Sequence, residues 1–525
     1  MIGLIKAVAS VLAIGSGSLL ANAGPIVLKP RSTNNSESFS IKAPLVVQTS
    51  SGIVHGAINE SVPLTRHFLG IPYAQSTFGK NRFRKAQPLP ASAAQQIIHA
   101  DAFGPNCPQY EATPASVYTD VRREYFIQGV NGDDCLSVSV WAPLYPTEDK
   151  VPVIVWIYGG GQTTGGSSVP YQNPQRWVQR TQSHIVVSLQ YRLNFFGQPN
   201  TPIENAGLYI FDARAALEWI RDNIVAFGGD PSRMVLWGQS AGATLTGALS
   251  IGWPDDPIVT GFIQDSGAVE GQGVHTIYTD TTHSNFTFLA NELGCTGNTT
   301  SQVECMSTYP QADIEAFIQF WTDAGKTPAL VFESYNDNNN TFANYTAAYL
   351  SGHYAKLPKI LGHNLIDGAS TAALSSGPPD IEGPTPEKEL AATLHVRCGV
   401  VAEAQIRQSL NATTYRFEYS GNFSNLSPLP FMGAYHSSEL PMIFGTYADV
   451  GGDGTRFQKD TSEAMQDLWL AFARDPENGL SNAGWPKYEE GSVEVLGGEQ
   501  NGTLVTHYAT PKAGIEDACL TYTGN

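Results

Sequence analysis

A serine stands at the centre of residues 238–242, which read Gly-Gln-Ser-Ala-Gly. The apolar run 234–237 before it predicts a buried strand, and residues 243–249 after it predict a helix. Small neighbours tolerate the crowding of a tight strand-to-helix turn, and the serine hydroxyl there stands clear of the sheet. Amide groups at the start of a helix also favour a developing negative charge. The context predicts that Ser240 is a nucleophile; the alternative is a plain turn with a solvated serine.

A serine nucleophile needs a histidine base, which a carboxylate orients. After this strand–turn–helix motif, the acid is expected first in the chain and the histidine second. Among the 11 histidines, His436 has the most suitable setting, a loop at 433–440 that begins with glycine. For the acid, Asp367 follows a run at 359–361 that predicts a strand. Most Asp and His residues are solvated or structural, so position alone leaves both assignments open.

Three apolar runs supply strands that would position these residues, at 151–158, 185–191 and 234–237. Runs that are apolar on both faces are typical of central parallel strands, which helices cover on both sides. Between the second and third runs, residues 212–226 place apolar side chains at helical spacing. The order strand, helix, strand predicts an open α/β sheet.

Composition limits the class of protein. The chain has 525 residues, of which 42% are hydrophobic and 15% charged, which allows a large core and excludes a disordered or collagen-like chain. A net charge of −18 without a basic run argues against a nucleic-acid partner or an anionic membrane surface. Short apolar stretches around a Ser-Gly turn at 43–58 predict a small N-terminal β-meander, within a single domain that spans residues 24–525. No metal-ligand spacing occurs in the sequence, so neither a metal nor a cofactor is expected.

Residues 1–23 have the three parts of a secretory signal peptide. Lys6 supplies the positive charge, residues 7–20 are apolar, and Ala-Asn-Ala at 21–23 supplies a cleavage site. A membrane anchor is the alternative, but this run is short and contains Gly and Ser, and no later segment offers about 18 uninterrupted apolar residues. We therefore expect a protein of the secretory pathway that becomes extracellular, without stable membrane insertion.

The cysteines and the glycosylation sequons fit the same route. Six cysteines, an even number, agree with an oxidising compartment. Spacing allows a small loop between Cys295 and Cys305 and a larger one between Cys107 and Cys135, but many pairings of six cysteines remain open. Candidate N-glycosylation sites are Asn34, Asn59, Asn285, Asn298, Asn339, Asn344, Asn411, Asn422, Asn425 and Asn501.

Ordered motifs through most of the chain carry a family resemblance, at residues 70–74, 82–84, 133–136, 156–161, 191–193, 222–231, 238–242, 436–441 and 485–488. With these motifs the chain resembles the type-B carboxylesterases, a family that includes cholinesterases and several fungal lipases and esterases, and a fungal member is expected. The resemblance implies an α/β-hydrolase fold, with a large, mostly parallel central sheet and helices on both faces. It also implies hydrolysis of carboxylic esters through an acyl-enzyme.

The resemblance implies a role for each candidate. Ser240 is expected to be the nucleophile, His436 the general base and acid, and Asp367 the carboxylate that orients the histidine. Most relatives have Glu at the third position, so the shorter Asp requires a slightly closer loop. Side chains would obstruct backbone amides that must approach the substrate oxygen, which suits glycine. The amides of this oxyanion hole are expected from Gly160, Gly161 and Ala241.

Further positions match the family around these residues. The resemblance places Ser266, Gln239 and Glu439 next to the catalytic residues, with Gln239 where cholinesterases have Glu. A quaternary ammonium substrate needs aromatic faces and a favourable charge. Because the loop between the first two cysteines also lacks tryptophan, acetylcholine is not the expected substrate. The implied disulfides are Cys107–Cys135, Cys295–Cys305 and Cys398–Cys519.

The loop at 111–134 also bears on the substrate. Lipase-like relatives use it as an amphipathic lid, whereas here it carries Asp120, Arg122, Arg123 and Glu124 without an apolar stripe. We expect an esterase whose partner is a small, soluble or short-acyl ester. The alternatives are a lipase and a tailoring esterase or lactonase of fungal secondary metabolism, such as mycotoxin or polyketide biosynthesis. A non-catalytic adhesion member would have a broken triad, and all three positions are intact.

Overall fold

The computed structural model describes residues 42–110, 115–201, 207–269, 280, 282–332 and 339–522. These residues belong to one compact unit, Ser40–Asn525. The signal peptide predicted at 1–23, the sequon at Asn34 and residues 111–114 of the predicted loop lie outside the described residues.

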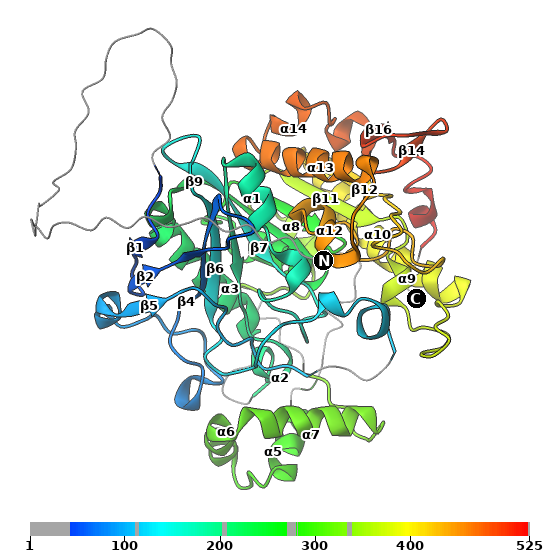
Figure 1. Ribbon diagram of the computed structural model, residues 1–525. Coiled ribbons are helices and arrows are strands. Elements are labelled where there is room, and N and C mark those ends of the chain that lie inside the picture. The colour runs from blue at the N-terminus through cyan, green and yellow to red at the C-terminus, as the bar shows by residue number, and fades with distance from the viewer. Residues whose placement is uncertain are drawn as a thin grey trace, which may run out of the picture. The chain divides into compact units, whose positions relative to one another are not determined.

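A twisted central sheet runs through the molecule (Figure 1). Its seven middle strands, from β8 to β13, are parallel to one another, and antiparallel strands flank them at both ends. In spatial order its eleven strands are β16 (His507–Pro511), β13 (Ser492–Leu496), β12 (Thr414–Tyr419), β11 (Lys359–Asn364), β10 (Gly261–Asp265), β9 (Gly229–Gln239), β7 (Val151–Ile157), β8 (Ile185–Leu189), β6 (Ser137–Pro143), β4 (Thr65–Pro72) and β3 (Ala57–Ile58).

The three apolar runs form β7, β8 and β9, neighbours at the centre of this sheet. Every residue of β7 and β8 is buried, as expected for strands that are covered on both faces. Helices pack against both faces of the sheet (Figure 1). One face carries α1 (Gln175–Thr181) and α13 (Arg456–Arg474), and the other carries α3 (Leu208–Asn223), α4 (Ala241–Gly252) and α10 (Pro386–Ser409). The mostly parallel α/β sheet is thus confirmed.

A small sheet is also present near the N-terminal end of the described chain. It contains β1 (Val46–Gln48) and β2 (Ile53–His55), which pair in antiparallel fashion. Its third strand, β5 (Ile97–His99), pairs in parallel with β2 and comes from a later part of the chain. Residues of β3 instead leave this small sheet and extend the edge of the central one. A separate hairpin joins β14 (Glu499–Gln500) and β15 (Thr503–Leu504).

The remaining helices are short and surround the sheet. A group of three, α5 to α7, packs around its own apolar cluster, seen at the bottom of Figure 1. The bounds of these helices are α2 (Asn194–Gly197), α5 (Ser284–Glu292), α6 (Thr299–Thr308), α7 (Gln311–Asp323), α8 (Tyr345–Leu350), α9 (Gly368–Thr371), α11 (Leu440–Phe444), α12 (Tyr447–Gly451) and α14 (Gly479–Asn482). Within the described ranges, no helix has the length and apolar character needed to cross a membrane.

All six cysteines are paired, in the combination that the family resemblance implied. Cys295–Cys305 closes a short segment of 10 residues, whereas Cys398–Cys519 joins positions 121 residues apart and ties the C-terminal segment to α10. Cross-links of this kind restrict the unfolded chain. The bond Cys107–Cys135 spans the loop at 111–134.

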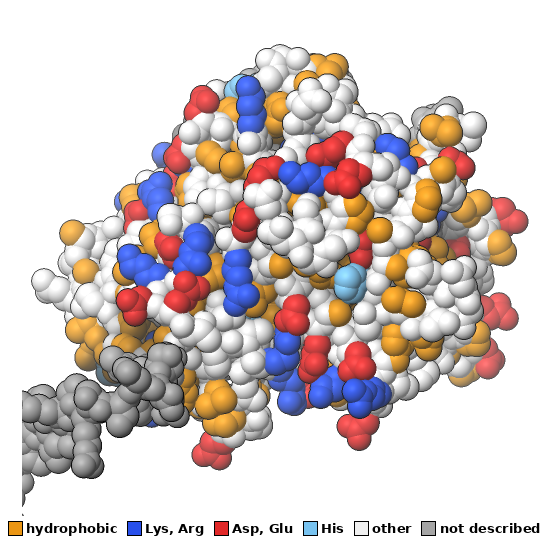
Figure 2. All heavy atoms as spheres, turned by 90° about the horizontal axis from the view of Figure 1, so that it is seen from above, with side chains coloured by type: hydrophobic (Ala, Val, Ile, Leu, Met, Phe, Trp, Pro, Cys, Tyr) orange, Lys and Arg blue, Asp and Glu red, His pale blue; other side chains and the backbone are white. Residues whose placement is uncertain are grey.

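Charged side chains are spread over the surface. On the face shown in Figure 2, basic and acidic side chains alternate, without an extended basic patch. Several of them form exposed ion pairs, such as Arg176–Asp449 at 2.6 Å and Arg180–Asp467 at 2.5 Å. Exposed pairs stabilise a fold by at most about 1 kcal/mol each, so the buried core supplies most of the stability.

Candidate active site

Ser240 occupies a strained turn between β9 and α4. Its backbone angles are φ 56° and ψ −126°, a conformation that non-glycine residues rarely adopt. A Cβ atom at Gly238 would lie 2.2 Å from the carbonyl oxygen of Gly242, and one at Gly242 would lie 2.2 Å from that of Ile157. Both flanking positions therefore require glycine. The turn leaves Ser240 and Ala241 partly exposed, whereas Gln239 and Gly242 on either side of them are buried.

The end of β10 and the residues that follow it pack against this turn. The backbone amide of Ser240 donates a hydrogen bond to the carbonyl of Asp265 at 2.8 Å. A Cβ atom at Gly267 would lie 2.3 Å from the carbonyl oxygen of Ser240, so the two segments are in close backbone contact. The strained conformation of the serine is thus fixed by neighbouring strands.

His436 and Asp367, 69 residues apart, are hydrogen-bonded. His436 Nδ1 lies 2.7 Å from Asp367 Oδ1, and the carboxylate is fully buried. Asp367 lies three residues beyond the end of β11, in agreement with the predicted strand, and its second oxygen accepts the backbone amide of Asn364 at 2.9 Å. The loop of His436 is fixed in turn, because Tyr118 Oη donates to the His436 carbonyl at 2.8 Å.

The other ring nitrogen of His436 faces the turn that contains Ser240. His436 Nε2 lies 3.0 Å from the side-chain nitrogen of Gln239, the residue that precedes Ser240. Within the described part of the chain, no hydrogen bond joins the Ser240 hydroxyl to the imidazole. The structure thus brings His436 into contact with Asp367 on one side and with the serine turn on the other.

Three glycines follow β7 and lie against the same turn. Gly160 and Gly161 have positive φ angles of 112° and 63°, which glycine adopts without strain. A Cβ atom at Gly159 would lie 2.8 Å from both Ser240 Cβ and Gln239 Oε1, so this backbone approaches Ser240 as closely as glycine permits. Gly161 lines one cavity together with Ser240 and Ala241.

Buried carboxyl groups surround the histidine loop. Glu439 is fully buried and accepts a hydrogen bond from the side-chain amide of Asn364. Burial, and to a lesser extent the neighbouring Asp265, raises the pKa of Glu439 to about 8. Burial also raises the pKa of Asp265 well above its usual range, although Trp237 Nε1 donates to it at 2.7 Å. Among the described residues, the buried hydroxyl of Ser266 has no hydrogen-bond partner.

The sequence did not single out several of these neighbours. Asp265, Asn364 and Tyr118 contact the serine turn, the acid and the histidine loop, respectively. The one available signal was a carboxyl group, that of Asp265, at the end of the apolar strand β10. The charged residues at 120–124 are not all exposed to solvent. Arg122 is buried, and its Nε donates to the carbonyl of Leu426 at 2.9 Å.

A cavity of about 440 Å³ opens over Ser240. This volume lies within the range of small-molecule binding sites. Among the described residues that line it, none carries a charged side chain. Apolar side chains form one part of the wall and carboxamides another, including Phe195, Ile318 and Phe332 and also Gln162, Asn194 and Gln198.

Comparison with known proteins shows the family to which the chain belongs. The sequence profile of the carboxylesterase family matches residues 43–390 and 385–513. A chlorogenic acid esterase of Aspergillus niger is 38% identical over 502 residues, which cover 90% of this chain and 94% of the relative. Secreted lipase 5 of Gibberella zeae is 38% identical over 508 residues, or 90% and 92% of the two chains. An acetylcholinesterase of Bungarus fasciatus is 28% identical over 507 residues, or 85% and 81%.

Proposed function

The chain belongs to the carboxylesterase family and is a carboxylic ester hydrolase, and we propose that Ser240, His436 and Asp367 carry out its reaction. The observation that carries the proposal is the position of the His436 ring, between the buried carboxylate of Asp367 and the strained turn of Ser240. A base held in one orientation beside an activated serine is the arrangement that acyl transfer requires.

In the first half of the proposed reaction, Ser240 Oγ attacks the ester carbonyl and His436 Nε2 takes the hydroxyl proton. Asp367 keeps the other proton of the ring on Nδ1, so that Nε2 is free to act as a base. The tetrahedral oxyanion is stabilised by the backbone amides of Gly160, Gly161 and Ala241. Each such donor typically stabilises the transition state by about 3 kcal/mol.

The second half of the reaction releases the acid. His436, now protonated at Nε2, gives its proton to the leaving alcohol, and an acyl group remains on Ser240. Water then attacks the acyl-enzyme while Nε2 again accepts a proton. The same amides stabilise the second oxyanion, and the serine is restored. Every proton passes through one nitrogen atom, which explains why the orientation of this ring matters.

We propose soluble or short-acyl neutral esters as the substrates. None of the described residues that line the cavity is charged, which supports this, since a carboxylate would find no compensating charge among them. The charged loop also packs as a fixed element: Arg122 bonds to Leu426 and Tyr125 Oη lies 2.9 Å from Tyr435 Oη. This disfavours a lid that opens at an oil surface.

Disulfides and a relative that is secreted support an extracellular location.

The test compares the wild type with Ser240→Ala on p-nitrophenyl esters of graded acyl length. We expect a loss of kcat of about 10⁵-fold or more in the variant, because the nucleophile is gone. In the wild type, kcat/KM should decline from acetate to palmitate. Full activity of the variant would refute the role of Ser240, and a preference for palmitate would refute the proposed substrate class. Chlorogenic acid, a soluble ester that carries a carboxylate, serves as the charged comparison, and a kcat/KM above that of the neutral short-acyl esters would refute the proposed preference for neutral substrates.

A further inference from the structure

The carboxamide of Gln239 contacts two parts of the site at once. Its nitrogen lies 3.0 Å from His436 Nε2, and its oxygen faces Gly159, where a Cβ atom would lie 2.8 Å from it. The side chain is only 2% exposed. It therefore occupies the side of the imidazole from which a proton must be accepted.

The chemistry of this contact depends on the proton of the ring. Asp367 accepts the Nδ1–H group, so the neutral ring presents a lone pair at Nε2. The Gln239 amide can donate an N–H group to that lone pair. Once Nε2 carries a proton, the same N–H group faces another donor and the interaction is lost. Rotation of the amide about its last carbon–carbon bond then presents the oxygen, which accepts from Nε2–H.

We propose that Gln239 is a positioning residue that holds the neutral His436 ring in place and turns its amide when the ring becomes protonated. This inference rests on the proposed role of Ser240 and His436. In the resting enzyme the amide occupies Nε2, and it yields this place to the Ser240 hydroxyl when an ester binds. A carboxamide has both a donor and an acceptor, so it can follow both protonation states; a carboxylate can only accept.

The other groups around His436 do not replace this function. Asp367 bonds to Nδ1, and Tyr118 and Ser370 contact the backbone carbonyl of His436. Glu439 lies three residues after His436. Burial raises the pKa of Glu439 to about 8, so this side chain is mostly uncharged at neutral pH. Asp265, whose pKa burial also raises, bonds to Trp237. Gln239 is therefore the described side chain that bonds to Nε2.

The test is the pH dependence of kcat/KM for p-nitrophenyl acetate in Gln239→Met and Gln239→Glu. Methionine removes both the donor to the neutral ring and the acceptor for the protonated ring; because the hydrogen bond to the charged ring is the stronger of the two, the midpoint of the acid limb should fall by about half to one pH unit. A carboxylate beside Nε2 stabilises the protonated ring more strongly, and the expected rise is about 1–2 units. A midpoint does not depend on the amount of folded enzyme, so partial misfolding does not hide the effect.

Gln302→Glu is the matched control, because Gln302 on α6 is similarly buried and bonds to Asn291 at 2.9 Å. Its midpoint should equal that of the wild type. A residue with a purely structural role would lower the plateau of the profile without moving the midpoint. An unchanged midpoint in Gln239→Met, with Ser240→Ala inactive, would overturn this inference alone. An active Ser240→Ala would overturn the proposed function and this inference with it.

Discussion

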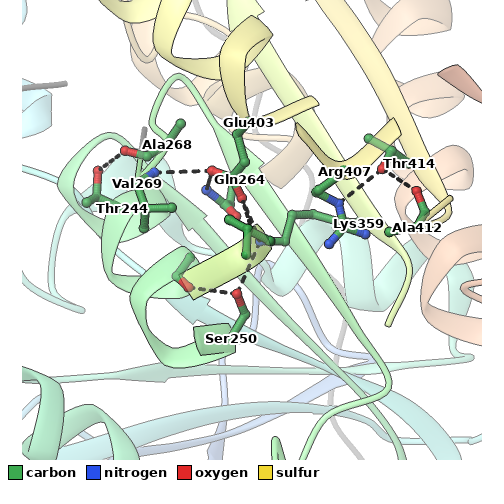
Figure 3. Close-up of polar contacts among 12 residues, drawn as sticks. Thr244, Ser250, Gln264, Ala268, Val269, Lys359, Glu403, Arg407, Ala412 and Thr414 are labelled. Carbon is green, nitrogen blue, oxygen red and sulfur yellow. Dashed lines mark hydrogen bonds and ion pairs between the residues drawn. The ribbon is translucent and has the colours of Figure 1, made fainter. Parts of the chain in front are cut away.

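A buried ion pair near the segment that supports the Ser240 turn leads to a quantitative stability prediction. Lys359 Nζ and Glu403 Oε1 lie 2.8 Å apart, and neither side chain is exposed. Glu403 also accepts the backbone amide of Val269 at 3.2 Å and the side chain of Gln264 at 3.3 Å, and Lys359 donates to Ser250 at 3.2 Å (Figure 3). The pair thus connects α10 and β11 with the segment that supports the serine turn.

The expected loss in the free energy of unfolding depends on which hydrogen-bond partners each variant leaves to the remaining buried group. Glu403→Gln leaves the ammonium buried beside neutral oxygens, at a cost of about 3–5 kcal/mol. Lys359→Met leaves a carboxylate that still accepts from Tyr349, Val269 and Gln264, so its cost should lie at the lower end of that range. The double variant removes both charges of the pair and keeps one amide oxygen as an acceptor, while the buried Arg407 nearby still donates to the carbonyls of Leu357 and Thr413. We expect it within about 2 kcal/mol of the wild type.

Urea unfolding at neutral pH, followed by tryptophan fluorescence, measures these free energies. Trp156 and Trp237 are fully buried in the core and report its exposure to solvent. Disulfides stay oxidised, and refolding on dilution establishes reversibility. The double-mutant cycle should give a coupling free energy of at least about 4 kcal/mol. A double variant as unstable as the sum of the two single variants would refute the reasoning, because the two charges would then act independently.

Two further predictions concern acid stability and glycosylation. Burial lowers the pKa of His184 from 6.5 to about 3, so between these values the unfolded chain binds a proton that the folded chain does not, and stability falls as the pH falls. His184→Gln should remove up to about 4 kcal/mol of the difference between the unfolding free energies at pH 7 and pH 3; an unchanged difference contradicts this. Among the sequons, Asn422 is exposed, whereas the amide of Asn425 donates to carbonyls at 3.1 and 3.2 Å and that of Asn285 at 2.8 Å. Glycopeptide mass spectrometry should find a glycan at Asn422 and none at Asn425 or Asn285, and modified Asn425 or Asn285 would contradict the assignment.

Local sequence patterns were sufficient for the centre of the fold. The runs that became β7, β8 and β9 are apolar on both faces, and the glycines around Ser240 are required by backbone contacts shorter than any side chain allows. Asp367 was placed beyond a short strand, and that strand, β11, is present. In these cases the residue type and its neighbours determine the structure.

Sequence patterns do not predict contacts between segments that are far apart in the chain. The third strand of the small sheet, β5, pairs with β2, which comes much earlier in the chain. No periodicity in the sequence encodes the pairing of two strands so far apart. The same is true of Tyr118, which reaches the histidine loop 318 residues away. The proximity of Gln239 and His436 depends on the paths of two loops, and sequence alone placed them together only through the family resemblance.

The most direct measurement of the central claim is labelling of the wild-type enzyme with a p-nitrophenyl phosphonate, followed by peptide mass spectrometry. The account predicts one equivalent of p-nitrophenol per active enzyme, loss of esterase activity in parallel, and an adduct on Ser240. His436→Ala should react far more slowly, because the serine proton then has no acceptor. An adduct on another residue, or full activity after complete modification of Ser240, would contradict the account.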